Sequence, residues 1–520
     1  MLILARMNPA EDVANLVVRG LYRDSVQLME LMDRLKRMKG VVDAAVVMAT
    51  DSNREALKKL GLLTQQGLTA GPNDIIVAVK ATDAASVLET ARELLLKGSS
   101  AHRKGPSLDE AINEKVDFAS ISVPGRYVNE IASRLLERGT NLFIFSDHVP
   151  IDVEVSLKTR AREMGVLVMG PEAGTAIIGG IGFGFANSIK KGPVGVVGSA
   201  GSGIQELAVL LDWMGIGISH AIGVGGRDLT KQVGGISSIE ALKILMDDRD
   251  TQVIAVITKQ SDEEIVKTVL ESVRVTKPIM TAILGSQRKY IGQYPNSPTL
   301  HNLAIEICRT ASVERFKAHY SLFLEEVVGL KRLVGEGLGH PRGFYSGGTL
   351  ATETAYIWNW LGLQVYTNMT HSWTKKLAKS SHSEGATVVD FGDEEFTHGR
   401  PHPIIDPSLR NARVSAELSL EDVSAVVMDL IIGYGAPDNI VEKTVGEVGW
   451  AIRSHAKKLA IHVVGTPSDH QWGQTGLLEG LPIVRAPSNA LAAAFAAAHS
   501  IGEVDVIERV SNSLILGDLA

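Results

Sequence analysis

The sequence predicts an α/β protein built on parallel, doubly wound sheets, and three observations support that fold class. Short apolar runs alternate with amphipathic segments along most of the chain. Glycine is abundant, at 51 of 520 residues, and aromatic residues make up only 5%. Many of the apolar runs are rich in valine, isoleucine and alanine, as is typical of strands buried within parallel layers. At roughly 150 residues per domain, the length favours three or four domains.

Composition excludes several classes of protein. The net charge is -7 and the pI about 6.1, so nucleic acid and anionic membranes are poor partners. The single cysteine, Cys308, excludes a disulfide framework and fits a reducing cytoplasm. No apolar run approaches the ~18 residues of a membrane span. We therefore expect a cytoplasmic protein and, since the histidines show no metal-ligand spacing, no metal site.

Residues 1–98 are expected to form a small α/β domain. Expected strands lie at 16–18, 44–49 and 74–80, and expected helices at 26–38, 51–60 and 83–97. Three strand–helix pairs in this order allow a ferredoxin-like arrangement. Residues 99–115 are polar and lack a hydrophobic period, which predicts a linker.

From residue 116 onward the same alternation predicts three further α/β domains, at 116–191, 192–330 and 331–520. Their expected strands lie near 119–123, 142–145, 166–169, 194–197, 253–257, 279–284, 387–391, 424–430 and 459–464. A helical segment at 313–332 joins the last two domains.

An internal repeat relates two segments that lie 147 positions apart. Ser199–Gly215 reads SAGSGIQELAVLLDWMG and Ser346–Gly362 reads SGGTLATETAYIWNWLG. The shared residues include Glu206 with Glu353, Trp213 with Trp360, and Gly215 with Gly362. Chance similarity between two amphipathic helices is the alternative, but duplication of a whole domain is the preferred interpretation.

Each copy opens with small residues in a strand-to-helix turn. The first turn comprises Ser199, Ala200, Gly201, Ser202 and Gly203, and the second comprises Ser346, Gly347, Gly348, Thr349 and Leu350. Small residues let backbone N–H groups approach a ligand, and a helix N-terminus adds about half a positive charge. Two such turns predict one anion site, most often for phosphate, between two helix N-termini. The alternative is that both are tight packing turns.

Three further side chains suit an anionic substrate. Arg400 and His402 share an Arg-Pro-His-Pro loop, and Arg227 precedes Asp228 in a glycine-rich loop. Arginine can hold a carboxylate or phosphate through two parallel hydrogen bonds, and neutral histidine can move a proton near pH 7. The alternatives are a structural loop with surface charges around Arg400 and an internal ion pair for Arg227.

Short segments along most of the chain match a known family. They are Val123-Pro124, Gly170-Pro171, 191–197 (KGPVGVV), 199–201 (SAG), 223–229 (GVGGRDL), Lys277-Pro278, 344–350 (FYSGGTL) and 399–407 (GRPHPIIDP). Residues 118–315 resemble the α subunit of succinyl-CoA synthetase, and residues 340–520 resemble the carboxy-terminal ligase domain of its β subunit. The fusion is similar to the FdrA family of acyl-CoA-synthetase-like proteins. This implies a Rossmann-like CoA-binding-type domain at 116–191 and two flavodoxin-like succinyl-CoA-synthetase ligase-type domains after it.

The sequence also departs from the synthetase pattern. In the synthetases, two helix N-termini hold the phosphate of a phosphohistidine in a Gly-His-Ala-Gly loop. Here that loop reads Gly285-Ser-Gln-Arg-Lys-Tyr290, without histidine, and His301 farther on is a poor substitute. The expected glutamate after the 253–257 strand is replaced by Thr258-Lys259. The glycine-rich CoA turn and the nucleotide-binding grasp domain are not found. The resemblance therefore implies the fold without the ATP-driven ligase mechanism.

The resemblance implies a subunit of an oxamate carbamoyltransferase in allantoin (purine) breakdown. This enzyme interconverts oxalurate and phosphate with oxamate and carbamoyl phosphate, with no cofactor required. The partners would be these small anions, together with companion subunits or further copies of the chain, and the catalytic candidates are Arg400, His402 and Arg227. Two alternatives stay open: an acyl-CoA synthetase of the ADP-forming succinyl-CoA ligase type that binds CoA or nucleotide and acyl acids, and a non-catalytic scaffold with the same fold.

Overall fold

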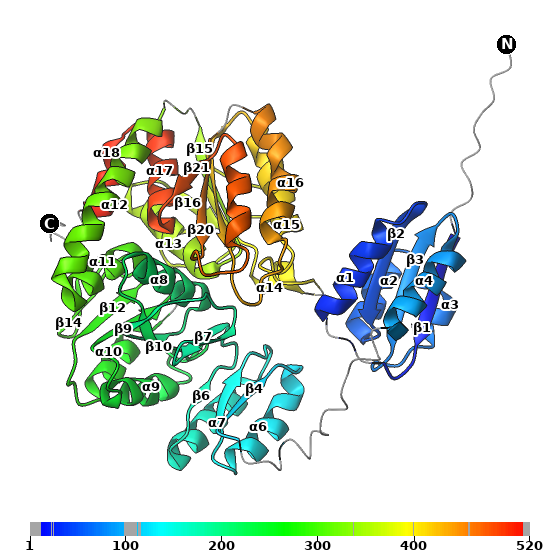
Figure 1. The fold of residues 1–520 in the computed structure, drawn as a ribbon, viewed down its shortest axis with the longest axis horizontal. Coiled ribbons are helices and arrows are strands. Elements are labelled where there is room, and N and C mark those ends of the chain that lie inside the picture. Colours follow the sequence, from blue (N-terminus) through cyan, green and yellow to red (C-terminus); the bar gives the residue numbers. More distant parts are fainter. Residues whose placement is uncertain are drawn as a thin grey trace. The chain divides into compact units, whose positions relative to one another are not determined.

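The computed structural model describes residues 12–512 except 22, 24, 98–111, 113–115, 260, 336, 338, 399 and 456–457. The chain divides into two compact units, Met1–Ala111 and Ile112–Ala520 (Figure 1). All of the expected linker at 99–115 except Ile112 lies outside the described residues.

The first unit is a three-stranded antiparallel sheet covered on both faces. The sheet order is β1 (Asp12–Val18), β3 (Ile75–Ala81) and β2 (Val41–Met48). One apolar cluster packs α1 (Ser25–Lys36) and α4 (Ala84–Lys97) against the sheet, and a second packs α2 (Asp51–Lys59). Helix α3 (Gln65–Leu68) contacts β1. The order of strands and helices is the one the sequence predicts, except that the short helix α3 between α2 and β3 was not predicted.

The second unit begins with a small parallel layer. Its strands are β4 (Phe118–Ile121), β5 (Asn141–Ile144) and β6 (Val168–Met169), and its helices are η2 (Gly125–Tyr127), α6 (Val128–Leu136) and α7 (Ile151–Met164). The strands pair in parallel through β5, as expected for a Rossmann-like unit.

A six-stranded sheet follows. Its order is β12 (Ile279–Ile283), β11 (Val253–Thr258), β9 (Lys191–Gly198), β10 (Ile218–Gly223), β7 (Thr175–Ile178) and β8 (Ile181–Gly184), with α8 (Gly201–Trp213), α9 (Ile236–Asp247), α10 (Glu263–Glu271) and α11 (Leu300–Ala311). A two-stranded ribbon, β13 (Tyr290–Ile291) and β14 (Tyr294–Pro295), lies before α11. The four strands from β9 to β12 are parallel, whereas β7 and β8 join antiparallel. Residues 175–184, expected in the preceding domain, thus extend this sheet, because their antiparallel pairing with β10 covers an otherwise open edge.

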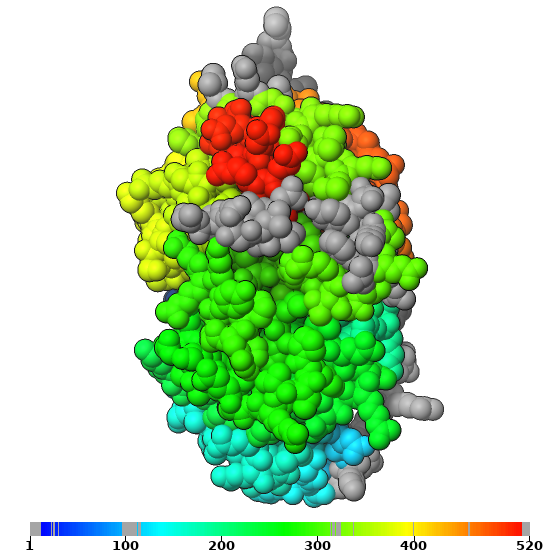
Figure 2. Space-filling view, turned by 90° about the vertical axis from the view of Figure 1, so that its left-hand side faces the viewer, coloured from blue at the N-terminus to red at the C-terminus, as the bar shows by residue number. Residues whose placement is uncertain are grey.

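The last sheet has seven parallel strands. Its order is β17 (Lys375–Lys376), β16 (Val365–Thr367), β18 (Ala386–Asp390), β15 (His340–Tyr345), β19 (Val423–Ile431), β20 (Lys458–Val464) and β21 (Val484–Ala486). Its helices are α12 (Val313–Leu333), α13 (Gly348–Trp360), α14 (Glu394–Thr397), α15 (Ser408–Leu418), α16 (Ile440–Ser454), η3 (Trp472–Gly480), α17 (Asn489–Ile501) and α18 (Asp505–Asn512). Lys331 on α12 pairs with Asp505 and Glu508 on α18. Figure 2 shows the α18 segment, in red, beside the green surface of α12.

The repeated segments adopt the same local structure. Ser199 and Ser346 each follow a central strand, and α8 and α13 begin and end at equivalent residues. Both helices stop before a glycine with positive φ, 70° at Gly215 and 86° at Gly362. Duplication predicts this match, and one continuous apolar core includes residues of both copies.

Candidate functional site

The N-termini of α8 and α13 meet where the two large sheets join (Figure 1). Thr349 N–H donates to Ser202 Oγ at 3.3 Å. A Cβ on Gly203 would lie 2.8 Å from Thr349 Cγ2, so glycine avoids a collision with the threonine methyl group at this approach. We call residues 199–203 and 346–350 together the paired cradle. The structure therefore brings the two sequence-predicted turns together.

The α13 turn of the paired cradle already holds an anion from the protein. Ser346 N–H and Gly347 N–H donate to the Asp429 carboxylate at 2.8 and 2.7 Å. Arg410 Nη1 neutralises this carboxylate at 2.8 Å and donates to Ser346 Oγ at 2.6 Å. The expectation that the second turn is free for a ligand is therefore wrong for Ser346 and Gly347, because an internal carboxylate occupies their N–H groups.

Among the described residues, no carboxylate hydrogen-bonds to the α8 turn as Asp429 does to the α13 turn. In the first copy, Ile257 pairs with Gly198 at the end of β9. In the register of the second copy, the position equivalent to Ile257 is that of Asp429 beside β15, so an apolar residue replaces the carboxylate. No side chain caps α8, so its first turn keeps the unpaired N–H groups of a helix N-terminus. The Thr175 hydroxyl is buried without a hydrogen-bond partner among the described residues. It would lie 3.4 Å from a Cβ on Gly201. An external anion would satisfy both groups.

Three charged or polar side chains surround the start of α13. A Cβ on Gly348 would collide with Asp390 Oδ2 and would lie 2.6 Å from Lys259 Nζ. A Cβ on Gly392 would lie 2.8 Å from His402 Nε2 and 3.1 Å from Asp390 Oδ1. Within the described part of the chain, Lys259 forms no ion pair. Its ammonium group is therefore available to a ligand beside Asp390 and His402.

Burial and the Lys259 charge set the protonation of this cluster. Burial raises the pKa of Asp390 to about 6, although the nearby Lys259 opposes the rise. Burial and Lys259 together lower the pKa of His402 to about 4, and they do the same for His371. At neutral pH the cluster therefore contains the Lys259 ammonium, the Asp390 carboxylate and the neutral imidazole of His402, and His371 is neutral as well.

The small parallel layer reaches this cluster through aromatic contacts. The ring of Phe185 lies 5.7 Å from the His402 ring and 5.6 Å from the Phe145 ring at the end of β5. His148 Nε2 pairs with Glu394 Oε1 at 2.9 Å. All three layers of the second unit thus approach the site at the carboxyl ends of their strands, where doubly wound folds bind ligands.

Arg227 and Arg400 have different surroundings from those the anion-ligand hypothesis requires. Arg227 Nη2 pairs with buried Glu154 at 2.9 Å and donates to the Val149 carbonyl, which is the internal ion pair left open by the sequence. The Arg400 side chain is exposed, and no hydrogen bond joins it to a described residue of the paired cradle. The internal ion pair accounts for Arg227, whereas an anion-binding role of Arg400 stays a prediction.

Sequence reasoning missed five residues of the site: Lys259, Asp390, Asp429, Arg410 and Thr175. Asp429 lies within the apolar run VSAVVMDLI, where a charge inside a buried strand was an available signal. Lys259 and Asp390 follow or end expected strands, so their place at the carboxyl edge of a parallel sheet could also have been inferred. Thr175 and Arg410 carried no comparable signal.

Three protein-family models match the chain. The model described as AllF, heavy metal-associated domain, matches residues 11–111, which contain no cysteine. The CoA binding domain model matches residues 189–281 and the CoA-ligase model residues 344–499. The CoA binding domain match covers the β9–β12 sheet and not the expected CoA-binding-type domain at 116–191, whose boundaries remain predictions.

A full-length relative decides the family. The uncharacterized protein YahF of Escherichia coli is 32% identical over 491 residues, which span 90% of this chain and 95% of YahF. The chain belongs to the FdrA-like family of acyl-CoA-synthetase-like proteins. This confirms the predicted α/β fold class. In the described part of this FdrA-like chain, no helix is long and apolar enough to cross a membrane.

Two ADP-forming ligase subunits match about a third of the FdrA-like chain. Sulfoacetate-CoA ligase subunit SqwL from an Acholeplasma species is 27% identical over 191 residues, 35% of this chain and 62% of that subunit. Subunit alpha 2 of succinate–CoA ligase from Archaeoglobus fulgidus is 25% identical over 186 residues, 34% of this chain and 63% of that subunit. The chain therefore spans less than two thirds of either ligase subunit.

Proposed function

We propose that this FdrA-like chain is an enzyme, or an enzyme subunit, that transfers an acyl group between phosphate and a small acceptor at the paired cradle. The observation that carries the proposal is the uncapped N-terminus of α8 beside the buried, unpartnered Thr175 hydroxyl. Backbone N–H groups, a hydroxyl and the Lys259 ammonium form a donor set suited to phosphate without a metal. A scaffold would gain nothing from leaving these groups unsatisfied.

The proposed transfer does not pass through a phosphohistidine. The loop after β12 contains no histidine between Gly285 and Tyr290. Trp373 covers that loop, since a Cβ on Gly285 would lie 3.0 Å from Trp373 Cζ2. The acyl group therefore passes directly between phosphate oxygen and acceptor.

Asp390 favours a carbamoyl group as the group transferred. Its carboxylate can accept hydrogen bonds from the two N–H groups of a carbamoyl unit, whereas it would repel an acyl group that carries its own carboxylate, such as succinyl. We therefore propose that oxamate and carbamoyl phosphate are interconverted with oxalurate and phosphate, the reaction that the FdrA resemblance implies. Lys259 is suited to the negative charge of either substrate.

Proton balance assigns a role to His402. As the oxamate nitrogen attacks the carbamoyl carbon, the bond from that carbon to the phosphate oxygen breaks. The nitrogen loses one proton and the departing phosphate gains one. Neutral His402, beside Asp390, can take the first proton and return it to the phosphate. N–H groups of the paired cradle stabilise the oxyanion that forms, typically by ~3 kcal/mol per donor.

A second candidate is acyl transfer between phosphate and CoA. The matches to the CoA binding domain model, the CoA-ligase model and ADP-forming ligase subunits favour it. The turn after β4 does not fit the glycine-rich loop of a dinucleotide-binding unit, because Gly125 packs against the carbonyls of Asp147 and His148. No step of the proposed transfer therefore uses CoA.

One product assay separates the two candidates. The purified chain is incubated with carbamoyl phosphate and oxamate, or with succinyl phosphate and CoA, each with and without ADP, and the products are identified by mass spectrometry. We expect oxalurate, and we expect Lys259→Met to lower its rate at least ~10²-fold, as for loss of a charge that stabilises the transition state. Arg400→Ala is the matched control and should keep nearly full activity.

The other outcomes decide against this assignment. Formation of succinyl-CoA without oxalurate would select the CoA candidate. Absence of both products, or an equal loss of rate in the Arg400 control, would reject acyl transfer at the paired cradle by the groups named.

A further inference from the structure

Two buried glutamates lie at equivalent positions of the repeat. Glu206 is on α8 and Glu353 on α13, each five residues after the first residue of its helix. Both are fully buried, at 0% exposure. A carboxylate at such a position is costly unless it is fully hydrogen-bonded, so its partners reveal what it holds in place.

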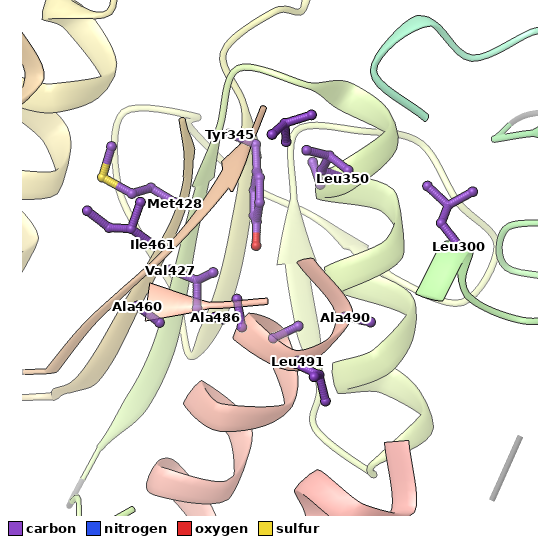
Figure 3. Packing of buried hydrophobic residues seen from close by; sticks show 14 of the residues in the cluster. Leu300, Tyr345, Leu350, Val427, Met428, Ala460, Ile461, Ala486, Ala490 and Leu491 are labelled. Carbon is purple, nitrogen blue, oxygen red and sulfur yellow. The ribbon is translucent and has the colours of Figure 1, made fainter. Parts of the chain in front are cut away.

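Each carboxylate binds the first turn of a helix from the other copy. Glu206 Oε1 accepts from the backbone N–H of Asn489, the first residue of α17, at 3.1 Å. Glu353 Oε1 accepts from the backbone N–H of Leu300, the first residue of α11, at 2.7 Å. Figure 3 shows Leu300 at the start of α11, and Ala490 and Leu491 at the start of α17, on either side of α13.

The second oxygen of each glutamate joins the same network. His462 Nε2 lies 2.6 Å from Glu206 Oε2. Asn489 Nδ2 donates to Glu353 Oε2 at 2.8 Å and to the Leu350 carbonyl at 3.0 Å. Asn489 thus binds both glutamates, and through Leu350 it contacts the first turn of α13, which belongs to the paired cradle.

The charges around Glu353 come from four packed elements. Burial and Glu206 raise the pKa of Glu353 to about 7, while Asn489, Leu300 N–H and His462 oppose the rise. Burial lowers the pKa of His462, but the net shift is upward because the neighbouring Glu206 raises this pKa. Burial and His462 lower the pKa of His301 on α11 to about 3, and burial raises the pKa of Tyr345 on β15 well above its usual value.

We propose that Glu206 and Glu353 are positioning residues of the paired cradle. Each glutamate ties its own helix to a helix of the other copy, and the two ties together fix the N-termini of α8 and α13 at the separation that suits one phosphate. This inference rests on the proposed function, since the phosphate is the ligand whose site the glutamates define.

The rate at which an engineered disulfide forms reports how close the N-termini of α8 and α13 lie, and this measurement needs no bound ligand. A Cβ on Gly203 would lie 3.5 Å from Thr349 Cβ, within the range of a disulfide, so Gly203→Cys with Thr349→Cys should cross-link. The only native cysteine, Cys308, is buried. Glu206→Asp or Glu353→Asp shortens the tie by one methylene and keeps its charge. We expect either change to slow cross-linking about tenfold, because the thiols meet less often.

Glu417→Asp is the matched control. Glu417 is also buried, at 3% exposure, but it pairs with Arg342 and Arg413 away from this network. This control should leave the cross-linking rate unchanged. Equal cross-linking rates in all three variants would overturn the inference, whether or not the chain binds phosphate.

Anion binding gives a second readout that a purely structural role would not change. Sulfate is the probe, because it does not titrate near neutral pH, and every protein carries Asp390→Asn to remove that carboxyl from the profile. Protonated Glu353 cannot accept two N–H donors equally well. We therefore expect sulfate to bind about threefold more weakly at pH 6 than at pH 8. Glu353→Gln should bind with the pH 6 affinity at both values.

The affinities decide two questions separately. The same affinity at both pH values in the Asp390→Asn protein, or a pH profile that survives Glu353→Gln, would overturn the positioning role. Failure of every protein to bind sulfate would contradict the phosphate site of the proposed function, while the cross-linking rates would still decide the inference.

Discussion

At the scale of single residues, Lys259 controls the site more than the arginines that the sequence singled out. Its charge opposes the rise in the pKa of Asp390 and lowers the pKa values of His371 and His402. Burial is the larger cause of the low histidine pKa values, and Lys259 adds to it, so both imidazoles are neutral, as a group that accepts protons requires. The Lys259 ammonium thus attracts anions and also favours the neutral, proton-accepting form of the nearby imidazoles.

Replacing Lys259 with methionine should change these three pKa values in a defined direction. Without the ammonium, the pKa of His402 and of His371 should rise from about 4 toward the ordinary value of 6.5, and that of Asp390 should rise above about 6. Burial still applies, so the histidines should stay below 6.5. Titration of nitrogen-15-labelled histidine by NMR measures the change.

The matched variant is Lys379→Met, since Lys379 is exposed and lies in the same half of the chain. Its histidine titration should match that of the wild type. Unchanged titration of His371 and His402 in Lys259→Met would contradict the assigned role of Lys259.

At the scale of elements, the turn before α13 is held by one buried ion pair. Asp429 accepts from two N–H groups of the turn, and Arg410 binds both Asp429 and the Ser346 hydroxyl. Arg410 and Asp429 are 2% and 0% exposed. Removing one member of such a pair leaves an uncompensated buried charge, which costs more than the pair itself contributes.

Asp429→Asn should therefore destabilise the second unit by about 3 kcal/mol, whereas Asp429→Asn combined with Arg410→Met should recover part of that loss. The recovery is expected because methionine removes the unpaired guanidinium and fills a similar volume. Thermal unfolding of the two variants and of Arg410→Met alone measures the difference. A double variant that is less stable than Asp429→Asn would contradict this account.

The elements themselves were largely predictable, and the contacts between them were not. Apolar period and glycine placement locate β9, β11 and β18 to within a few residues. Short strands such as β7, β16 and β21 escape this reasoning, because three or four residues carry too little pattern. The two glycine-rich turns were recognisable from the repeat, but the choice of Asp429 as an internal anion depends on strand register, which sequence spacing alone does not give.

At the scale of the whole second unit, the two copies of the repeat share one interior. The largest apolar cluster contains Ile204 and Leu207 from α8, Leu350 from α13 and the alanine-rich face of α17. Hydrogen bonds cross between the copies as well, such as Asn187 Nδ2 to the Ile432 carbonyl at 2.8 Å. Helix α12 extends from α11 to α18 and joins the two halves along the chain.

The shared interior predicts that a cut between the copies leaves the unit assembled. A protease site inserted between residues 334 and 339 breaks the chain in the connection before β15 and removes none of the cross-repeat contacts. Apolar burial stabilises by about 25 cal/mol per Å², so a core common to both pieces should hold them together. We expect the cleaved protein to elute as one species in gel filtration and to separate only in denaturant.

The uncleaved insertion variant controls for the added residues. The piece that ends at residue 334, produced alone, should expose apolar surface and bind a hydrophobic dye. Pieces that separate in native buffer would show instead that each copy closes its own core, and the ties through Glu206 and Glu353 would then join two independent domains.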